Sequence, residues 1–401
     1  MQSLQAFHEQ LRSGALLGAR QIKLSAGLRE FPRELFQFAD TLEVLDLSGN
    51  QFSALPDDLA RFTRLRILFA SNNPFTELPR VLGGMPQLEM VGFKACQIRE
   101  VPAESLPPAL RWLILTDNQI RHLPGTLGER PRLQKLMLAC NQLQDLPASL
   151  AQCTRLELLR ISGNAFAQIP DAVFALPALA WLAIAGNPLT QKNEQLALSR
   201  SDQRAIFHHS LEQHELLGEG ASGHIYRASR IGGGDVALKV FKAGQTSDGT
   251  PASELAAGLS ASLHPHLLTP LAPVAGHPQG KLAMALPLLP PGLQALAGPP
   301  SMDSCTRDVY APATRFSPDV AQRLLQGIES AVGHLHAHGI LHGDLYAHNV
   351  LWNPATGDAV LSDLGAAALL HGLPQEQVQQ LLHMEQRAMT ILKSEVQART
   401  A

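Results

Sequence analysis

The sequence predicts an α/β solenoid followed by an α+β domain of two lobes. Three observations support this prediction. The pattern L-x-x-L-x-L-x-x-N returns every 22 or 23 residues from Leu42 onward. A glycine-rich segment, LLGEGASGHIYRA, is followed by VALK, which ends at Lys239. Near the C-terminus, ILHGDLYAHNVLW places Asp344 five residues before Asn349. The repetition indicates a stacked array, and the later motifs indicate a separate domain.

Composition excludes several classes of protein. The chain has 401 residues, enough for two or three domains, with 45% hydrophobic residues and a net charge of −3. This balance gives no sign of a nucleic-acid or membrane-surface partner. The N-terminus lacks the apolar core of a signal peptide, and prolines interrupt the longest apolar stretch, LAMALPLLPPGLQALAGPP. The four cysteines show no metal-ligand spacing. We therefore expect a cytoplasmic protein.

The first half is a repeat array. We expect a helical cap over residues 1–18 and eight strand segments over residues 19–190. The segments begin at Ala19, Leu42, Leu65, Leu88, Leu110, Leu133, Leu156 and Leu179. Each copy supplies a short strand whose apolar residues share one core with its neighbours, and the Asn side chain bonds to the backbone where the chain turns. Cys96 takes the place of that Asn in the fourth copy.

These residues resemble leucine-rich repeats of the 23-residue cytoplasmic kind, which form a horseshoe. In each strand, the residues that flank the second conserved Leu face the hollow of the horseshoe. Most of them are apolar, and exposed apolar patches usually mark interaction sites. We expect a protein partner to bind the concave face at Ile67, Phe69, Met90, Trp112 and Trp181. The alternative is that another part of this chain covers these residues.

The second half begins with a linker, residues 191–209, which is polar and partly helical. In the domain that follows, residues 210–401, a G-x-G-x-x-G match is trailed by Lys239, 16 residues after Gly223. The intervening residues read as strand–turn–strand, whereas a dinucleotide-binding fold would need a helix there. Glycines let the backbone approach ATP phosphates closely. The candidate nucleotide-binding residues are Leu217, Gly218, Glu219, Gly220, Ala221, Ser222, Gly223, Ile225, Lys239 and Glu254.

Glu254 is included because it is the only acidic residue between Asp248 and Asp303. It is therefore the candidate ion-pair partner of Lys239. The alternative is a solvated carboxylate at the start of a helix, where acidic residues are favoured.

Two further motifs complete the set. Asp344 and Asn349 have the spacing of a phosphotransferase catalytic loop, and Asp363 follows 19 residues after Asp344 within Asp-Leu-Gly. Glycine loop, Lys, Glu, Asp, Asn and Asp occur in this order in one fold, and the domain resembles a eukaryotic-type protein kinase. The whole chain resembles bacterial leucine-rich-repeat protein kinases.

The resemblance implies a serine/threonine protein kinase with ATP and Mg²⁺ as cofactors and a protein substrate. Asp344 would deprotonate the acceptor hydroxyl. Asn349 and Asp363 would hold Mg²⁺. Lys239, paired with Glu254, would orient the triphosphate, so the expected catalytic residues are Asp344, Lys239 and Asn349.

The sequence departs from this family in three places. Gly343 replaces an Arg that reads a phosphorylated activation loop, and Tyr346 replaces the Lys that stabilises the transferring phosphate. His348 would compensate only weakly as a neutral imidazole. Only 36 residues follow Gly365, enough for one or two helices, so the C-terminal lobe is expected to be incomplete.

Two other functions stay open. HGDL-x-x-x-N is also the signature of aminoglycoside- and choline-type phosphotransferases, which Gly343 favours. The short C-terminus favours a pseudokinase scaffold that binds ATP without transferring phosphate.

Overall fold

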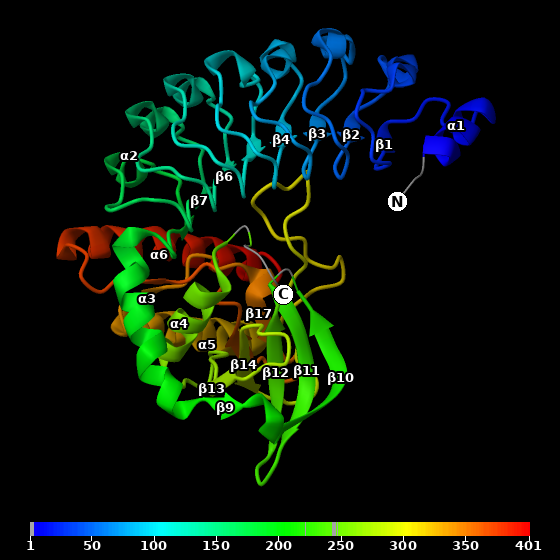
Figure 1. Cartoon of the computed structure of the whole chain (residues 1–401). Coiled ribbons are helices and arrows are strands. Elements are labelled where there is room, and N and C mark those ends of the chain that lie inside the picture. The colour runs from blue at the N-terminus through cyan, green and yellow to red at the C-terminus, as the bar shows by residue number, and fades with distance from the viewer. Residues whose placement is uncertain (1–3, 221, 243–245, 247) are drawn as a thin grey trace. The chain divides into compact units, whose positions relative to one another are not determined.

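The computed structural model describes residues 4–220, 222–242, 246 and 248–401 (Figure 1). The chain divides into two compact units. The first comprises Met1–Leu159 and Asn164–Leu179, and the second comprises Arg160–Gly163 and Ala180–Ala401. The residues that end the repeats are therefore grouped with the second half of the chain.

The first unit is the predicted solenoid of parallel strands (Figure 1). It begins with α1 (Leu4–Arg12), and each strand is three residues long and pairs with the next. The strands are β1 (Gln21–Lys23), β2 (Val44–Asp46), β3 (Ile67–Phe69), β4 (Met90–Gly92), β5 (Trp112–Ile114), β6 (Lys135–Met137) and β7 (Leu158–Arg160), the last residue of which belongs to the second unit. The repeated leucines fill the interior; Leu42, Leu45 and Leu47 are 0% exposed.

Short helices connect the strands. They are η1 (Arg33–Phe38), η2 (Asp57–Arg61), η3 (Arg80–Gly84), η4 (Ala103–Ser105), η5 (Gly125–Glu129), η6 (Ala148–Gln152) and α2 (Asp171–Phe174). A proline stands directly before each of them, as Pro56 does before η2. Proline lacks an amide donor and has a fixed φ, so it suits the residue before a helical turn.

The repeated asparagines hold the turns together. Asn118 accepts a hydrogen bond from the Ile98 amide at 3.0 Å and donates to the carbonyls of Phe93 and Leu115. In the fourth copy, the Cys96 thiol contacts the Ala70 carbonyl at 3.5 Å. Burial raises the pKa of Cys96 to about 11, so the thiol stays neutral and fits the buried turn.

After Arg160–Gly163, the second unit continues with the last repeat strand, β8 (Trp181–Ala183), and α3 (Pro188–Ser201). Residues 191–209 hold most of α3, then η7 (Asp202–Arg204) and β9 (Ile206–Phe207), which pairs with β13 (Ala272–Ala275). Glu194 of α3 is buried and accepts hydrogen bonds from the Gly186 amide at 2.9 Å and the Ser253 hydroxyl at 3.0 Å. This carboxylate fastens α3 to α4 (Pro251–Ala261).

A six-stranded sheet forms the first lobe, in the order β10-β11-β12-β14-β13-β9. Its members after β9 are β10 (Leu211–Glu219), β11 (Gly223–Arg230), β12 (Asp235–Phe241), β13 (Ala272–Ala275) and β14 (Ala283–Pro287). η8 (His208–Ser210) leads into β10. All of these strands are antiparallel neighbours except β9 and β13. Within this sheet, the glycine-rich segment lies on β10 and β11, and Lys239 lies on the neighbouring β12.

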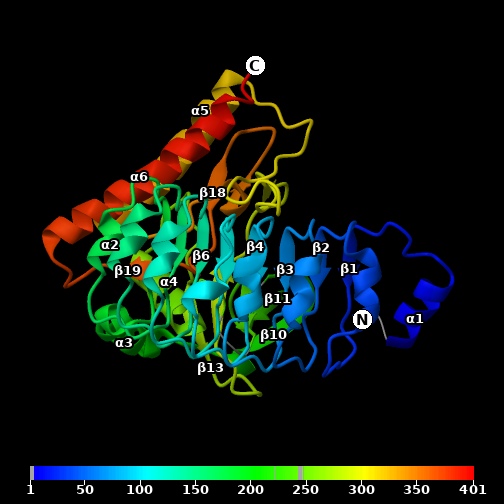
Figure 2. The same ribbon diagram turned by 90° about the horizontal axis from the view of Figure 1, so that it is seen from above.

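The second lobe is built on α5 (Pro318–Ala337) and α6 (Gln375–Gln397). Between them lie β16 (Ile340–Leu341), η9 (Ala347–Asn349), β17 (Val350–Trp352), β18 (Ala359–Leu361) and β19 (Ala368–Leu369), and β15 (Gln294–Ala295) precedes α5. Figure 2 shows α6 running beside α5, and Lys393 of α6 forms an ion pair with Glu329 of α5. One helix therefore follows Gly365, within the predicted range. No helix among the described residues combines the length and the apolarity needed to cross a bilayer.

Candidate active site

The glycine-rich segment forms the tip of the β10–β11 hairpin. Built-on Cβ atoms at Gly218 and Gly220 would meet nothing within 4 Å, so this part of the backbone is open. At Gly223 a Cβ would lie 2.7 Å from the Val240 carbonyl oxygen, so only glycine fits against β12. Lys242 donates to Glu219 at 2.6 Å and to the Gly220 carbonyl at 2.9 Å, which ties the hairpin to β12. Ala221 lies outside the described residues.

Lys239 and Glu254 form a buried ion pair. Lys239 is 8% exposed and Glu254 is 4% exposed. Thr250 caps α4 by accepting a hydrogen bond from the Ser253 amide at 3.1 Å, and this places Glu254 in the first turn of the helix. Burial raises the pKa of Glu254, while the charge of Lys239 opposes that rise. The alternative of a solvated Glu254 is wrong, because the carboxylate is enclosed.

A cavity of about 210 Å³, here called the motif cavity, is lined by many of the predicted nucleotide-binding residues and by Asp363, but not by Asp344 or Asn349. Its lining includes Gly220, Ser222, Gly223, Ile225, Lys239, Glu254 and Asp363. Leu217, Gly218 and Glu219 do not line it. Its apolar walls come from Leu268, Met284, Leu286 and Leu351, which were not predicted. Leu351 follows Asn349 closely in the alternating β17, and Met284 lies opposite Lys239 in β14, so strand pairing rather than any motif identifies them.

The Asp344 loop, residues 342–349, is held next to Asp363. The Asn349 amide nitrogen donates to the Asp344 carboxylate at 2.8 Å and to the Asp344 carbonyl at 2.9 Å. Ser362 donates to the Asn349 carbonyl through both its amide and its hydroxyl, each at 2.8 Å. Asp363 is exposed and adopts a left-handed backbone with φ of 59°. The structure thus brings the three predicted groups Asp344, Asn349 and Asp363 together.

Two residues from the end of the repeats contact the Asp344 loop. Arg160 forms an ion pair with Asp344 and donates to the Gly343 carbonyl at 2.8 Å. Trp181 stacks on Tyr346, with ring centroids 4.1 Å apart and planes 7° from parallel. All of these residues lie in the second unit. Burial opposes ionisation of Asp344, but the charge of Arg160 and the smaller effects of His348, His342 and the Asn349 hydrogen bond together outweigh burial, so the pKa of Asp344 is lowered.

The structure explains why position 343 is a glycine. Its φ is +75°, and a Cβ there would lie 2.5 Å from the Leu182 carbonyl and 2.7 Å from the Ala366 carbonyl. Its amide donates to the Glu385 carboxylate at 2.7 Å. An arginine at position 343 would therefore displace the strand that carries Trp181.

His348 is paired rather than isolated. Its Nδ1 lies 2.7 Å from an oxygen of the buried Asp308. Burial lowers the pKa of His348, but the hydrogen bond to Asp308 and the negative charges of Asp308, Asp344 and Asp363 together outweigh burial, so the pKa is raised. The expectation of a simple neutral imidazole overlooked this partner. Because Asp308 compensates any charge on His348, the pair adds little net positive charge to the Asp344 loop.

Glu385 of α6 bonds to the backbone of the Asp344 loop. It is 2% exposed, accepts from the Gly343 amide, and pairs with His336 of α5 at 2.7 Å. Sequence reasoning missed both Glu385 and Arg160. Each had a signal, since Glu385 interrupts the buried stripe Leu381, Met384, Ala388, Met389, and Arg160 stands in a mostly apolar column of the repeats.

Near the C-terminus of α6, the Glu395 carboxyl has a raised pKa. Burial and the nearby Asp308 raise the pKa of Glu395 to about 7, and Tyr310 donates a hydrogen bond to it at 3.3 Å. The folded state thus binds a proton that the unfolded chain has released, and the free energy of unfolding should fall between about pH 4.5 and pH 7. Urea unfolding at pH 5 and pH 8 should show a smaller loss for Glu395→Gln than for the wild type. Glu376→Gln, on the exposed first turn of α6, should behave as the wild type does; equal losses in both variants would contradict the assignment.

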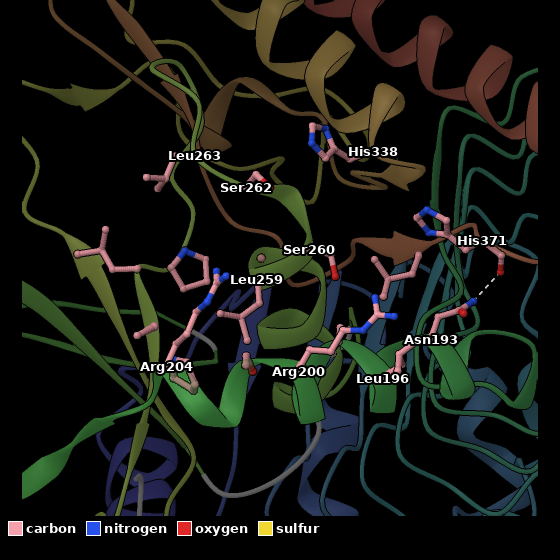
Figure 3. Close-up of a pocket in the computed structure, with 18 of the residues that line it drawn as sticks. Asn193, Leu196, Arg200, Arg204, Leu259, Ser260, Ser262, Leu263, His338 and His371 are labelled. Atoms are coloured by element: carbon pink, nitrogen blue, oxygen red, sulfur yellow. Dashed lines mark hydrogen bonds between the residues drawn. The ribbon is translucent and has the colours of Figure 1, made fainter.

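A larger cavity of about 940 Å³ lies beside α3 and α4 (Figure 3). Leu196, Leu263 and Leu271 line it and are more than one-third exposed, at 44%, 70% and 41%. Arg200 and Arg204 point into the same space (Figure 3). Among the residues that the structure describes, none of the predicted catalytic, nucleotide-binding or metal residues lines this cavity. The smaller motif cavity is therefore the candidate active site.

Comparison with known families agrees with this geometry. Residues 211–390 match the model of the protein kinase domain. Residues 108–166 and 131–189 match a leucine-rich repeat model, and residues 41–62 match another. The chain carries leucine-rich repeats followed by a protein kinase domain.

Similar proteins share only part of the chain. It is 33% identical over 92 residues to human PH domain leucine-rich repeat-containing protein phosphatase 1, covering 23% of this chain and 5% of that protein. It is 31% identical over 120 residues to "Probable inactive serine/threonine-protein kinase roco10" of Dictyostelium discoideum, covering 27% and 4%. Among solved structures, a Leptospira interrogans leucine-rich-repeat protein has 28% identity, 47% coverage of each chain and a TM-score of 0.42. The chain thus spans a small fraction of these curated relatives.

Proposed function

We propose that the protein is an ATP- and Mg²⁺-dependent protein kinase that phosphorylates serine or threonine hydroxyls. The observation that carries this proposal is that Lys239, Glu254 and Asp363 line the motif cavity, while Ser362, also in its lining, bonds to Asn349, which holds Asp344. Lys239 would bind the α- and β-phosphates, and Asp344 would accept the proton of the acceptor hydroxyl. Each group belongs to a separate element, so their meeting in one place requires the folded domain.

The oxygen donors suit magnesium. Asn349 donates through its amide nitrogen to Asp344, which leaves its amide oxygen directed elsewhere. Asp363 lines the cavity with an exposed carboxylate, one oxygen of which accepts from the Gly365 amide at 3.0 Å. Carboxylate and amide oxygens are ligands that Mg²⁺ prefers. We therefore propose Asn349 and Asp363 as its ligands; the ion would neutralise charge on the phosphates when bound.

One observation favours a second candidate, the pseudokinase scaffold. Asp344 is already bound by Arg160 and Asn349, and its side chain is only 15% exposed. An acceptor must therefore reach a partly enclosed carboxylate. Incubation of the purified protein with Mg-ATP, followed by mass spectrometry, separates the two functions: new phosphate on the protein supports the kinase, and none on the protein or on casein supports the scaffold.

We also propose that the repeats bind a protein partner in the cytoplasm. Phe69 and Trp112 are half-buried and remain the candidate contacts. Ile67 and Met90 are 6% and 3% exposed, so their side chains are not available as predicted. Trp181 is 1% exposed and covered by Tyr346, which corresponds to the alternative of an internal partner. Pulldown with Trp112→Ala tests the remaining surface, because aromatic anchors dominate many interfaces.

Nucleotide binding is the simplest test. Mg-ATP at about 100 times its Kd should stabilise the folded state by about 2.7 kcal/mol and raise Tm. Lys239→Ala should lose most of that shift, since the ammonium group faces the motif cavity. Lys281→Ala, outside the lining of that cavity, should keep it. An unchanged shift in Lys239→Ala would remove this residue from the phosphate site.

A further inference from the structure

A buried arginine joins three segments of the second unit. Arg160 is the last residue of β7, and its side chain is 2% exposed. Its Nη1 donates to the Gly343 carbonyl at 2.8 Å, its Nη2 pairs with Asp344, and its Nε lies 2.9 Å from a carboxylate oxygen of Asp248. Asp248 precedes α4, the helix that carries Glu254. One guanidinium thus connects the last repeats, the Asp344 loop and the entrance to α4.

The position explains two departures in the loop sequence. Tyr346 stands where a lysine would supply charge, and its ring is packed on Trp181, whose Nε1 donates to the Leu345 carbonyl at 3.0 Å. Gly343 has no room for a side chain. The loop therefore carries neither cation in its own sequence. A buried carboxylate without a cation is strongly disfavoured, and Arg160 supplies the charge from a residue 184 positions away.

The ion pair with Arg160 fixes the Asp344 carboxylate but leaves some of its acceptor sites available. An ionised carboxylate offers about four acceptor sites. Arg160 occupies one on Oδ1, and Asn349 occupies one on Oδ2. The rest of the site is assembled, because Lys239 is paired with Glu254 and both line the motif cavity. If Arg160 blocked the site, we would expect the Lys239–Glu254 pair to be broken or the motif cavity to be filled.

We propose that Arg160 is a positioning residue for phosphate transfer, which holds Asp344 and the entrance to α4 in the geometry that the acceptor hydroxyl requires. The proposal rests on the kinase function proposed above. The end of the repeats then forms part of the catalytic unit in addition to any partner binding. Because Asp344 and Asp248 share the guanidinium, a displacement of β7 would disturb the loop and the helix together.

The test uses the full-length protein and separates rate from nucleotide binding. We would measure autophosphorylation at saturating Mg-ATP and the ATP concentration that gives half that rate. Arg160→Gln should lower the maximal rate about 100-fold, the order of loss that a misplaced reacting group produces. The half-saturating ATP concentration should stay nearly unchanged. Arg160→Lys should restore part of the rate, and Asp248→Asn should cause a smaller loss because Asp248 only orients the guanidinium.

Arg155→Gln is the matched control, since Arg155 is an exposed arginine of the same repeat. A maximal rate in Arg160→Gln equal to or above the wild type would overturn the proposal, as would an Arg160→Lys variant no better than Arg160→Gln. If Arg160→Gln fails to fold, the other two variants decide: wild-type rates in both Arg160→Lys and Asp248→Asn would also overturn the proposal. A wild type that transfers no phosphate at all would instead refute the kinase function itself.

Discussion

Asp344→Asn should lower phosphate transfer by roughly 10²- to 10⁴-fold, the usual contribution of a general base. An amide cannot accept the hydroxyl proton, although it can keep a hydrogen bond to Asn349. Nucleotide binding should persist, because Asp344 does not line the motif cavity. The rate is measured by phosphate incorporation detected by mass spectrometry, and binding is measured by the Tm shift that Mg-ATP produces.

The control for this variant is Asp358→Asn. Asp358 lies on an exposed turn of the same lobe and accepts a hydrogen bond from the Thr356 hydroxyl at 2.7 Å. We expect wild-type transfer from it. Unchanged transfer in Asp344→Asn would remove this carboxylate from the reaction and would leave Asp363 as the remaining carboxylate to consider. Loss of both transfer and the Tm shift would indicate damage to the fold.

Local patterns predicted most of the fold. The L-x-x-L-x-L periodicity located strands such as β2 and β3, because each repeat buries its own leucines against its neighbours. The spacing of the motifs predicted Lys239, Glu254, Asp344, Asn349 and Asp363 as site residues. In the structure Lys239 pairs with Glu254, Asn349 bonds to Asp344, and Asp363 lines one cavity with Lys239 and Glu254. The contacts within the pairs are local in the chain, 15 residues apart for Lys239 and Glu254 and 5 for Asp344 and Asn349.

What the sequence could not predict are contacts between distant segments. Arg160 meets Asp344 across 184 residues, and Trp181 meets Leu345 across 164 residues. No periodicity relates such positions, and the repeat pattern only shows that a side chain faces the hollow. Ile67 and Met90 were expected to be accessible because the repeat pattern directs them to the hollow, but they are 6% and 3% exposed. The pattern gives the direction of a side chain but not what lies over it.

Trp181→Ala should have the largest effect on stability. The ring is 1% exposed, stacks on Tyr346 and donates to the Leu345 carbonyl. Removing a buried Trp leaves a cavity and typically costs about 3–5 kcal/mol. In a unit of this size such a loss should lower Tm by roughly 6–20 °C, at about 2–4 °C per kcal/mol. The variant should also lose phosphate transfer, because Tyr346 and the Asp344 loop lose their packing surface.

Trp112→Ala provides the comparison. Trp112 occupies the same column of the repeats but is half-buried, and Lys135 lies 4.1 Å from its ring centroid. The Trp112 Nε1 also donates to the Met137 sulfur at 3.2 Å. These two contacts are worth about 1–2 kcal/mol together, so Trp112→Ala should lower Tm much less than Trp181→Ala does. The sequence predicted both tryptophans as partner contacts, whereas the burial of Trp181 assigns it to the packing of the fold. If Trp181→Ala melts with the wild type while losing a bound protein, the ring is not packed on the Asp344 loop and the whole column is a partner surface after all.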